Sequence, residues 1–306
     1  MSHRIRLATR GSALALTQTE MAAAAIRALD PSVEVEVVEV STKGDQDQTT
    51  SLRILGGQGI FVGAVREAIL DGRADAAVHS LKDVPTTPAP ELTLAAMLER
   101  GDPRDVFVGR DGRRLAELPE GSRVGTSASR RVALLRALRP DLEVAEIRGN
   151  VDTRIAKVMA GDYEGAILAA AGMQRLGRLD EATQLFDAEA FLPSPGQGVI
   201  ALECRTDDDA TLALLRSIDH VHTRAAIEAE RGVLAALGTG CDLAVGAYAR
   251  VDGDLLTVRA MLGGDREGTE PVFGEATGPA SDAEKLGRGL GDHLKVGYES
   301  NYGAVS

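Results

Sequence analysis

A polar turn near residue 80 holds several side chains that could take part in catalysis or in ligand binding. It follows a stretch at residues 74–78 that is small and apolar after Asp75. Four polar side chains and a closing proline then follow: His79, Ser80, Lys82, Asp83 and Pro85. Polar groups at the end of a buried strand are typical of the ligand sites of open α/β sheets. Ordinary capped turns have the same pattern, so both interpretations stay open.

Asp83 is the group in this turn with the clearest chemistry. A carboxylate held near a cleft can act as a general acid or base, or it can stabilise a nearby positive charge. The other interpretation is that Asp83 caps the turn before Pro85. His79 ends an apolar run and is expected to be packed rather than to act as a base. Lys82 could form a Schiff base, but nothing in the sequence indicates that it is buried.

Arginines at turns and helix starts indicate sites for negatively charged groups. They are Arg10, Arg130, Arg131, Arg148, Arg154 and Arg175. A helix start attracts anions through its free N–H groups, and a guanidinium group adds a forked donor for carboxylate or phosphate. Ser12 and Ser129 are expected to be N-caps beside three of these arginines. Each arginine alone could be solvated or ion-paired, but recurrence at equivalent places in two segments favours a site for a polyanionic ligand.

The two cysteines, Cys204 and Cys241, show no spacing typical of a metal site, and no metal is expected. Cys241 lies in a glycine-rich loop after a predicted helix, where glycine lets the backbone project a side chain. Cys204 lies at a predicted strand end and is interpreted as structural. Cys241 is therefore the candidate nucleophile. No composed Cys/His/Asn set is visible, so a papain-like hydrolase is not expected.

The apolar pattern predicts α/β architecture in the first two thirds of the chain. The predicted strands are residues 4–8, 33–40 and 122–126, and the predicted helices are residues 13–29, 60–70 and 130–138. In two places a helix ends at a glycine, an acidic residue follows and a small-apolar strand begins. This repetition predicts two similar lobes. Lobe 1 is assigned residues 1–99 and 192–215, and lobe 2 is assigned residues 100–191.

The last third of the chain, residues 216–306, predicts a small α+β domain. A helix at 223–237 precedes two strands at 244–251 and 255–262, which are joined by a hairpin signal, and a final helix is expected at 281–294.

The polar stretch at residues 44–59 lies between a predicted strand and a predicted helix of the first lobe and has no clear pattern. Its length and polarity predict a lid over a site.

Composition limits the class of protein. The chain has 306 residues, with 34 basic and 46 acidic side chains and a formal net charge of −12. Such a chain lacks the basic footprint of a general nucleic-acid-binding protein. No signal peptide or long apolar segment is visible, so we expect a soluble, cytoplasmic chain without a membrane or nucleic-acid partner.

Eight motifs, in order from residue 5 to about residue 250, resemble the porphobilinogen deaminase (hydroxymethylbilane synthase) family. They are Ala8-Thr9-Arg10-Gly11-Ser12-Ala13-Leu14-Ala15, His79-Ser80-Leu81-Lys82-Asp83-Val84-Pro85, Asp102-Pro103-Arg104-Asp105, Gly125-Thr126-Ser127-Ala128-Ser129-Arg130-Arg131, Arg148-Gly149-Asn150-Val151-Asp152-Thr153-Arg154, Ala169-Ala170-Ala171-Gly172-Met173-Gln174-Arg175-Leu176, Gly196-Gln197-Gly198 and Gly240-Cys241. Any one motif is weak, but eight in the family's order are highly specific.

The resemblance implies two lobes like those of periplasmic binding proteins and a third domain. It implies that the Cys241 thiol carries a dipyrromethane cofactor through a thioether. Four porphobilinogen molecules would be joined to it head to tail, each losing ammonia to give an electrophilic azafulvene. Water would then release hydroxymethylbilane for tetrapyrrole (porphyrin and haem) biosynthesis. Porphobilinogen is thus the implied small-molecule partner, and a monomer is expected.

The resemblance also implies roles for individual residues. Asp83 would hydrogen-bond pyrrole N–H groups and stabilise the cationic azafulvene. Arg10, Arg148 and Arg154 would bind acetate and propionate side chains and support catalysis, and Arg175 would be a further substrate contact. The implied cofactor contacts are Cys241, Asp83, Ser12, Ser80, Lys82, Ser127, Arg130 and Arg131.

Three positions depart from the family pattern. Gln58 and Gly63 stand where relatives commonly have lysine, and Thr239 interrupts a more usual Gly-Gly before the cysteine. Two other functions agree with parts of the sequence. A two-lobed solute-binding protein for a small polyacid explains the lobes and arginines but leaves Cys241 unexplained. The other is a phosphate-handling transferase, but the sequence has no Gly-x-x-x-x-Gly-Lys-Ser/Thr loop.

Overall fold

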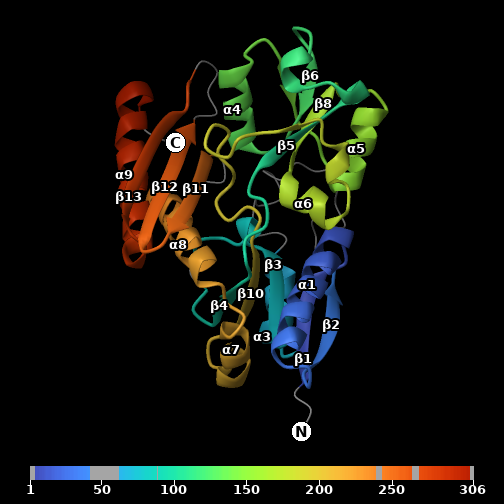
Figure 1. The fold of residues 1–306 in the computed structure, drawn as a ribbon, viewed down its shortest axis with the longest axis vertical. Helices are drawn as coiled ribbons and strands as arrows, with labels where there is room; N and C mark the ends of the chain where they lie inside the picture. Colours follow the sequence, from blue (N-terminus) through green and yellow to red (C-terminus); the bar gives the residue numbers. More distant parts are fainter. Residues whose placement is uncertain (1–3, 42–61, 88, 239–242, 264–268, 304–306) are drawn as a thin grey trace. The chain divides into compact units, whose positions relative to one another are not determined.

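The computed structural model describes residues 4–41, 62–87, 89–238, 243–263 and 269–303, which belong to two compact units (Figure 1). The first unit contains Met1–Gly101 and Gly198–Arg224, and the second contains Asp102–Gln197 and Ala225–Ser306. The division of the chain into three domains stays a prediction. Within the described ranges, no helix combines the length and apolar content needed to cross a membrane.

The first unit is built on a five-stranded mixed sheet with the order β2-β1-β3-β10-β4. Strand β1 runs parallel to β2 and β3, whereas β10 is antiparallel to both β3 and β4. The strands are β1 (Arg4–Arg10), β2 (Glu34–Val40), β3 (Ala76–Ser80), β4 (Leu92–Met97) and β10 (Ile200–Arg205). The helices are α1 (Ala13–Leu29), α3 (Gly63–Leu70), the 3₁₀ turn η2 (Leu81–Asp83) and α7 (Asp209–Arg216).

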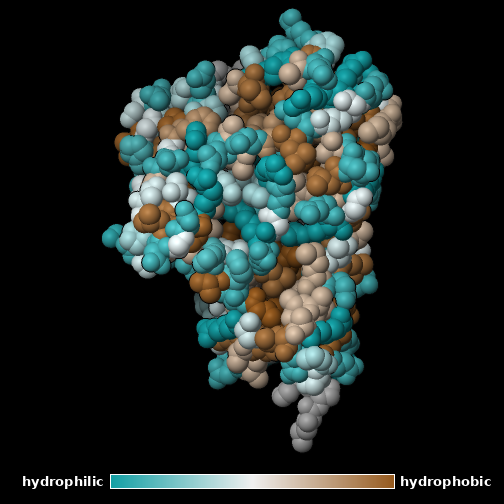
Figure 2. Space-filling view, in the orientation of Figure 1, coloured by the Kyte–Doolittle hydropathy of each residue, from teal (hydrophilic) through white to brown (hydrophobic). Residues whose placement is uncertain are grey.

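Helix α1 confirms the prediction for residues 13–29. The Ser12 side chain caps its start by accepting a hydrogen bond from the Ala15 N–H, as expected for an N-cap. Its buried residues, including Ala22, Ala23 and Ile26, pack on one face of the sheet, and α3 packs on the other face. The outer surface of α1 is also largely apolar in Figure 2, because the helix consists mostly of alanine and leucine.

The second unit repeats this arrangement in a sheet with the order β7-β6-β8-β5-β9. Strand β6 is parallel to β7 and β8, and β5 is antiparallel to β8. The strands are β5 (Asp105–Gly109), β6 (Arg123–Gly125), β7 (Glu143–Ala145), β8 (Gly165–Ala169) and β9 (Gln184–Leu185). The helices are α4 (Ser129–Leu138), α5 (Val151–Met159), α6 (Ala170–Arg175) and the 3₁₀ turns η3 (Arg110–Gly112), η4 (Leu115–Glu117) and η5 (Leu179–Glu181).

The two sheets confirm the prediction of two similar α/β lobes. In each sheet, three parallel strands are followed by one antiparallel strand. Strands β1, β2, β3 and β10 of the first sheet correspond in order and direction to β6, β7, β8 and β5 of the second. The polar turn after β3 therefore corresponds to the start of α6 after β8.

A third, antiparallel sheet in the second unit has the order β11-β12-β13. Its strands are β11 (Ala244–Asp252), β12 (Leu255–Gly263) and β13 (Val272–Pro279), and its helices are α8 (Val221–Leu237), α9 (Ala283–Tyr302) and the turn η6 (Ala280–Asp282). Residues of α8 and α9 and one face of the sheet form a separate core. This confirms the predicted hairpin and α+β class, but the last helix ends at Tyr302 rather than at residue 294.

Strand β13 is a feature that the sequence pattern did not predict. Its helix-facing positions are small because α9 packs closely against them. A Cβ atom at Gly274 would lie 2.9 Å from Leu290 Cδ1, and one at Gly278 would lie 2.9 Å from Leu286 Cδ2. The strand therefore lacks the large apolar alternation by which strands are recognised.

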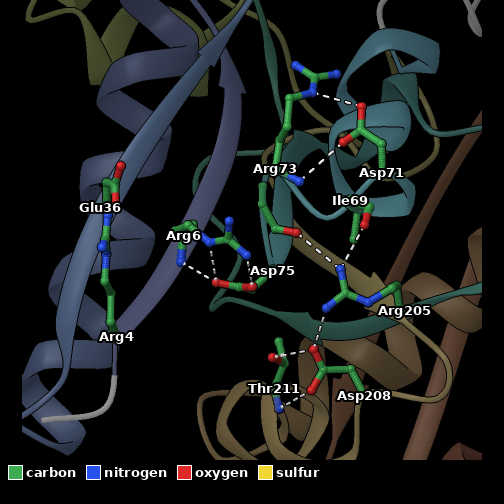
Figure 3. Close-up of polar contacts among 11 residues, drawn as sticks. Arg4, Arg6, Glu36, Ile69, Asp71, Arg73, Asp75, Arg205, Asp208 and Thr211 are labelled. Carbon is green, nitrogen blue, oxygen red and sulfur yellow. Dashed lines mark hydrogen bonds and ion pairs between the residues drawn. The ribbon is translucent and has the colours of Figure 1, made fainter.

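At the amino end of strand β3, charged side chains of the first unit are paired with one another (Figure 3). Arg6 donates to Asp75 through Nε at 3.1 Å and through Nη2 at 2.7 Å. Arg205 donates to the Ile69 and Ala74 carbonyls and pairs with Asp208 at 2.8 Å. These contacts tie β1, β3 and β10 together, so we assign this edge of the sheet to stability rather than to binding.

Candidate active site

The opposite edge of the first sheet collects the predicted site residues of this unit. Strand β1 ends at Arg10, and Ser12 follows as the cap of α1. Strand β3 ends at Ser80, and Lys82 and Asp83 follow in η2. Because β1 and β3 are parallel, their carboxyl ends lie at the same edge of the sheet. The structure thus brings these five residues to one edge.

The Asp83 carboxylate is half-buried, and it does not take part in the hydrogen bond that closes its turn. The turn is closed by the backbone hydrogen bond from the Val84 N–H to the Leu81 carbonyl, at 3.0 Å. Among the residues that the structure describes, none donates a hydrogen bond to the Asp83 side chain or pairs with it. The capping interpretation therefore has no support, and the carboxylate is available to a ligand.

Two serines at this edge differ in the hydrogen bonds they have left. The Ser80 hydroxyl donates to Gln18 Oε1 at 3.0 Å and accepts from Gln18 Nε2 at 2.8 Å. Ser12 uses only a lone pair, because its hydroxyl oxygen accepts from the Ala15 N–H. A hydroxyl has one proton and two lone pairs. Ser12 therefore keeps a donor for a ligand carboxylate, whereas Ser80 keeps only an acceptor.

His79 lies on the opposite face of the sheet from Ser80, because successive side chains along β3 point to alternate faces. It is buried, and its Nε2 lies 3.4 Å from Glu203 Oε2. Arg66 of α3 donates to both oxygens of Glu203 at 2.8 Å. Burial raises the pKa of Glu203, but the nearby His79 ring and the hydrogen bonds from Arg66 outweigh it and lower the pKa to about 2. The prediction that His79 is packed is confirmed.

In the second unit the remaining predicted arginines follow the equivalent strand ends. Ser127 comes after β6 and before α4, Arg148 comes after β7, and Arg154 lies in α5. Arg175 is the last residue of α6, which follows β8. Strands β6, β7 and β8 are parallel, so these segments lie at one edge of the second sheet.

Arg130 and Arg131 have buried internal partners that the sequence did not indicate. Both pair with Asp105, Arg130 at 2.7 Å and Arg131 at 2.6 Å. Burial raises the Asp105 pKa, but the two positive charges more than offset this and lower the pKa to about 2. The expected Ser129 cap is wrong, because α4 begins at Ser129 and its N-cap is Ala128, without a side-chain hydrogen bond.

Further hydrogen bonds of this pair distinguish the two arginines. Arg130 donates to the Leu192 carbonyl at 2.5 Å, and Arg131 donates to the Ile167 carbonyl at 2.8 Å. The Arg131 Nε atom is buried and has no hydrogen-bond partner within the described part of the chain. Arg131 therefore retains one donor, while the terminal nitrogens of Arg130 are committed to the fold.

Arg131, Arg148 and Arg154 form a cluster of like charges. Burial lowers the pKa of Arg154, and the positive charges of Arg131 and Arg148 lower it further, to about 10, while Glu146 partly opposes them. Arg154 Nε donates to the Gly149 carbonyl at 2.8 Å. Burial also lowers the pKa of Arg175. Repulsion among these cations would be relieved by a negatively charged ligand, so the cluster is suited to carboxylates.

Several predicted features lie outside the described residues: Cys241, Thr239, Gln58 and the stretch 44–59. Gly63 is the first residue of α3 and is exposed, with open space where a Cβ atom would lie. Cys204 is fully buried in β10, and burial raises the pKa of its thiol to about 11. The structural interpretation of Cys204 is confirmed.

Comparisons with known proteins agree on one family over nearly the whole chain. Residues 5–213 match the family model "Porphobilinogen deaminase, dipyromethane cofactor binding domain", and residues 225–296 match "Porphobilinogen deaminase, C-terminal domain". A porphobilinogen deaminase of Roseiflexus sp. (strain RS-1) is 45% identical over 294 residues, which cover 96% of each chain.

Similar solved structures include periplasmic-type binding proteins. The methionine-binding protein MetQ is 13% identical with a TM-score of 0.46, over 70% of this chain and 89% of MetQ. The VFT2 domain of Bordetella pertussis BvgS is 15% identical with a TM-score of 0.43, over 70% of this chain and 86% of that domain.

Proposed function

Because the chain belongs to the porphobilinogen deaminase family, we propose that Asp83 and the arginine cluster carry out the reaction of that family. The activity is that of hydroxymethylbilane synthase, in tetrapyrrole biosynthesis, and the cofactor is dipyrromethane. We assign porphobilinogen as the substrate. When bound, the cofactor supplies the free carbon to which the first substrate molecule is joined.

The residues present fit such a group. Dipyrromethane and porphobilinogen carry pyrrole N–H donors and negatively charged acetate and propionate side chains. The cluster of Arg131, Arg148 and Arg154 supplies positive charge with lowered pKa at Arg154. The Asp83 carboxylate supplies an acceptor without an internal partner among the described residues. Opposite charges are thus placed on two different strand-end sites.

Asp83 is assigned to the reacting ring. Its carboxylate accepts hydrogen bonds from pyrrole N–H groups and orients the ring. When ammonia leaves the substrate, positive charge spreads over this ring, and a fixed carboxylate stabilises that charge more in the transition state than in the ground state. Lys82 and Ser80 are the neighbouring contacts at the same strand end, with Ser80 limited to accepting.

The arginines are assigned to the carboxylates of the cofactor and the growing chain. The guanidinium groups of Arg148 and Arg154 lie beside other cations. A carboxylate bound there interacts favourably with several positive charges at once. Arg10 and Arg175 extend the set on β1 and α6. For Arg130 and Arg131, cofactor binding remains our proposal from the family pattern. The Arg131 Nε donor supports it, whereas the contacts of Arg130 favour holding the fold.

Ser12 and Ser127 complete the proposed cofactor contacts in different ways. Ser12 retains a proton that can be donated to a carboxylate. Ser127 donates its proton to the Ile147 carbonyl at 2.5 Å, so it can only accept from a ligand. The thioether is assigned to Cys241, in the third of three proposed domains. The family model that begins at residue 225 supports such a C-terminal domain.

The observation that carries this proposal is the unengaged carboxylate of Asp83 at the end of β3. Asp83→Asn should lower turnover of porphobilinogen by about 100-fold or more while the far-UV circular dichroism spectrum is unchanged. The matched control is Asp71→Asn, because Asp71 is exposed and pairs with Arg73 away from this edge. Near-normal turnover of Asp83→Asn would reject the catalytic assignment.

Attachment of the cofactor is tested by intact mass and peptide mapping. The denatured protein should exceed its sequence mass by two linked pyrrole units, and the excess should be on the peptide that contains Cys241. Cys241→Ser should lose it and Cys204→Ala should keep it. An unmodified Cys241 peptide from active enzyme would refute the assignment.

We also propose that the protein is a cytoplasmic monomer. Light scattering of the purified protein would test the monomeric state.

A further inference from the structure

The loop between β7 and α5 is fastened in an unusual way. Residues 146–149, here called the arginine loop, have four successive backbone carbonyls that each accept a hydrogen bond from a side chain. The four bonds are Tyr163 Oη to Glu146 O at 2.7 Å, Ser127 Oγ to Ile147 O at 2.5 Å, Lys157 Nζ to Arg148 O at 3.1 Å and Arg154 Nε to Gly149 O at 2.8 Å.

The donors of these bonds surround the loop. Ser127 follows β6, Arg154 and Lys157 lie in α5, and Tyr163 precedes β8. Most hydrogen bonds in proteins join backbone to backbone, and ordering a lysine side chain costs up to about 2 kcal/mol. Holding this loop with side chains from three segments therefore has an entropic cost. We infer that the cost is offset because the bonds fix the position of the loop.

The next residues make the same loop rigid. Gly149 has φ = +113°, and a Cβ atom there would lie 2.6 Å from Thr153 Cγ2. The Asn150 side chain then caps α5 by accepting from the Thr153 N–H at 2.9 Å. Only glycine fits this turn, and the helix start is fixed directly after it. The backbone on both sides of the Arg148 side chain is thus held in one conformation.

Lys157 is the informative member of the set. A lysine in the last turn of a helix can hydrogen-bond the last carbonyls of its own helix. Lys157 is half-buried, and its ammonium group instead reaches the carbonyl of Arg148, outside the helix. Tyr163 is buried, with 8% of its surface exposed. Its hydroxyl donates to the carbonyl of Glu146, which lies two residues before Arg148 in the chain.

We propose that Lys157 and Tyr163 are positioning residues that act through the arginine loop. They hold the backbone of Arg148 so that its guanidinium group stays beside Arg131 and Arg154 when no ligand carboxylate is present to offset their repulsion. Neither residue is assigned a contact with the ligand. The inference rests on the proposed function, because it requires Arg148 to bind a carboxylate of the substrate chain.

The test compares steady-state kinetics of variants with intact cofactor. Tyr163→Phe removes only the hydroxyl and keeps the ring that packs under Arg123, whose guanidinium carbon lies 4.9 Å from the ring centre. Lys157→Met removes the ammonium group and keeps the length of the side chain. Each should raise the KM for porphobilinogen about 5- to 10-fold, as expected for loss of one charged or buried hydrogen bond, with kcat within about twofold.

The controls separate positioning from stability. Lys157→Arg should restore KM, because arginine can also donate to the Arg148 carbonyl. Lys285→Met removes an exposed lysine from α9 and should leave KM unchanged. If Lys157→Met and Tyr163→Phe lower the urea midpoint but leave KM at the wild-type value, the residues are only structural and the inference is overturned.

A double-mutant cycle tests the route through Arg148. Arg148→Ala alone should raise KM, and adding Lys157→Met to it should raise KM by less than twofold further. An equal effect of Lys157→Met in both backgrounds would overturn the inference while leaving the function of Arg148 intact. An unchanged KM for Arg148→Ala would instead reject the proposed role of Arg148 itself.

Discussion

Asp105→Asn tests whether one buried carboxylate holds Arg130 and Arg131 in place. Asp105 is fully buried, and its oxygens lie 2.7 Å and 2.6 Å from the two guanidinium groups. Gln197 Nε2 donates to the same carboxylate at 2.9 Å. Asparagine has nearly the same shape but no charge, so the variant leaves two buried cations without their partner.

The size of the effect can be bounded in two ways. Removing one partner of a buried ion pair costs about 3–5 kcal/mol. The Asp105 pKa of about 2 lies below its ordinary value of 3.8, and at about 1.36 kcal/mol per pKa unit this difference contributes about 2 kcal/mol. The second figure is smaller because it describes protonation with the side chain in place. We therefore expect the free energy of unfolding at pH 7 to fall by about 3–5 kcal/mol.

The two figures also predict a pH dependence. A carboxyl group with a lowered pKa in the folded state stabilises the fold above its unfolded pKa. That contribution is lost as the pH falls from 3.8 towards 2. The difference in stability between wild type and Asp105→Asn should therefore be largest at neutral pH and should narrow by about 2 kcal/mol in strong acid.

Urea unfolding followed by far-UV circular dichroism measures both effects, since the chain has no tryptophan. At slopes of about 2–3 kcal/mol per molar urea, the midpoint of Asp105→Asn should fall by about 1–2 M at pH 7. Glu284→Gln is the control, because Glu284 forms an exposed pair with Arg288 within α9. A midpoint for Asp105→Asn as close to wild type as that of the control would refute the reasoning.

Three further predictions concern other buried or strained positions. Gly149→Ala should lower the urea midpoint and raise the KM for porphobilinogen, because the position has φ = +113° and a Cβ atom would press on Thr153; unchanged kinetics would count against a rigid loop. Glu203→Gln should lower the urea midpoint most at neutral pH, because a carboxyl group whose pKa is lowered from 4.5 to about 2 loses its stabilising contribution as the pH falls from 4.5 towards 2; an equal loss at pH 7 and pH 3 would contradict this. Cys204 should resist iodoacetamide at pH 8 in the folded protein and react in urea, because it is buried and its pKa is raised to about 11. Peptide mass spectrometry measures the alkylation, and an alkylated Cys204 in the folded protein would contradict the prediction.

Local signals in the sequence were sufficient for the elements that depend on local chemistry. The Ser12 cap, helix α1 and the hairpin of β11 and β12 follow from capping, apolar period and turn residues. Strand β13 could not be predicted in this way, because its small residues are dictated by α9 packing against them. The start of α4 was misplaced because a serine at a helix start does not by itself show which residue is the cap.

The site was predictable where residue type and strand end coincide, as for Asp83. It was not predictable where a partner comes from far along the chain. Nothing in the sequence near Arg130 indicates that Asp105 neutralises it, because the pairing depends on the fold of the second sheet. A polar residue that opens an otherwise apolar strand, as Asp105 does in β5, is the signal that could have indicated a buried partner.

The position of β10 in the first sheet has a consequence for the order in which the chain folds during synthesis. This strand lies between β3 and β4, yet about a hundred residues separate it from β4 in sequence. All strands of the second sheet lie between Asp105 and Leu185, so that sheet can be completed first. The first sheet has an unpaired β3 edge until β10 emerges from the ribosome. The amino-terminal lobe should therefore be the later of the two to complete folding, and the stage most exposed to aggregation.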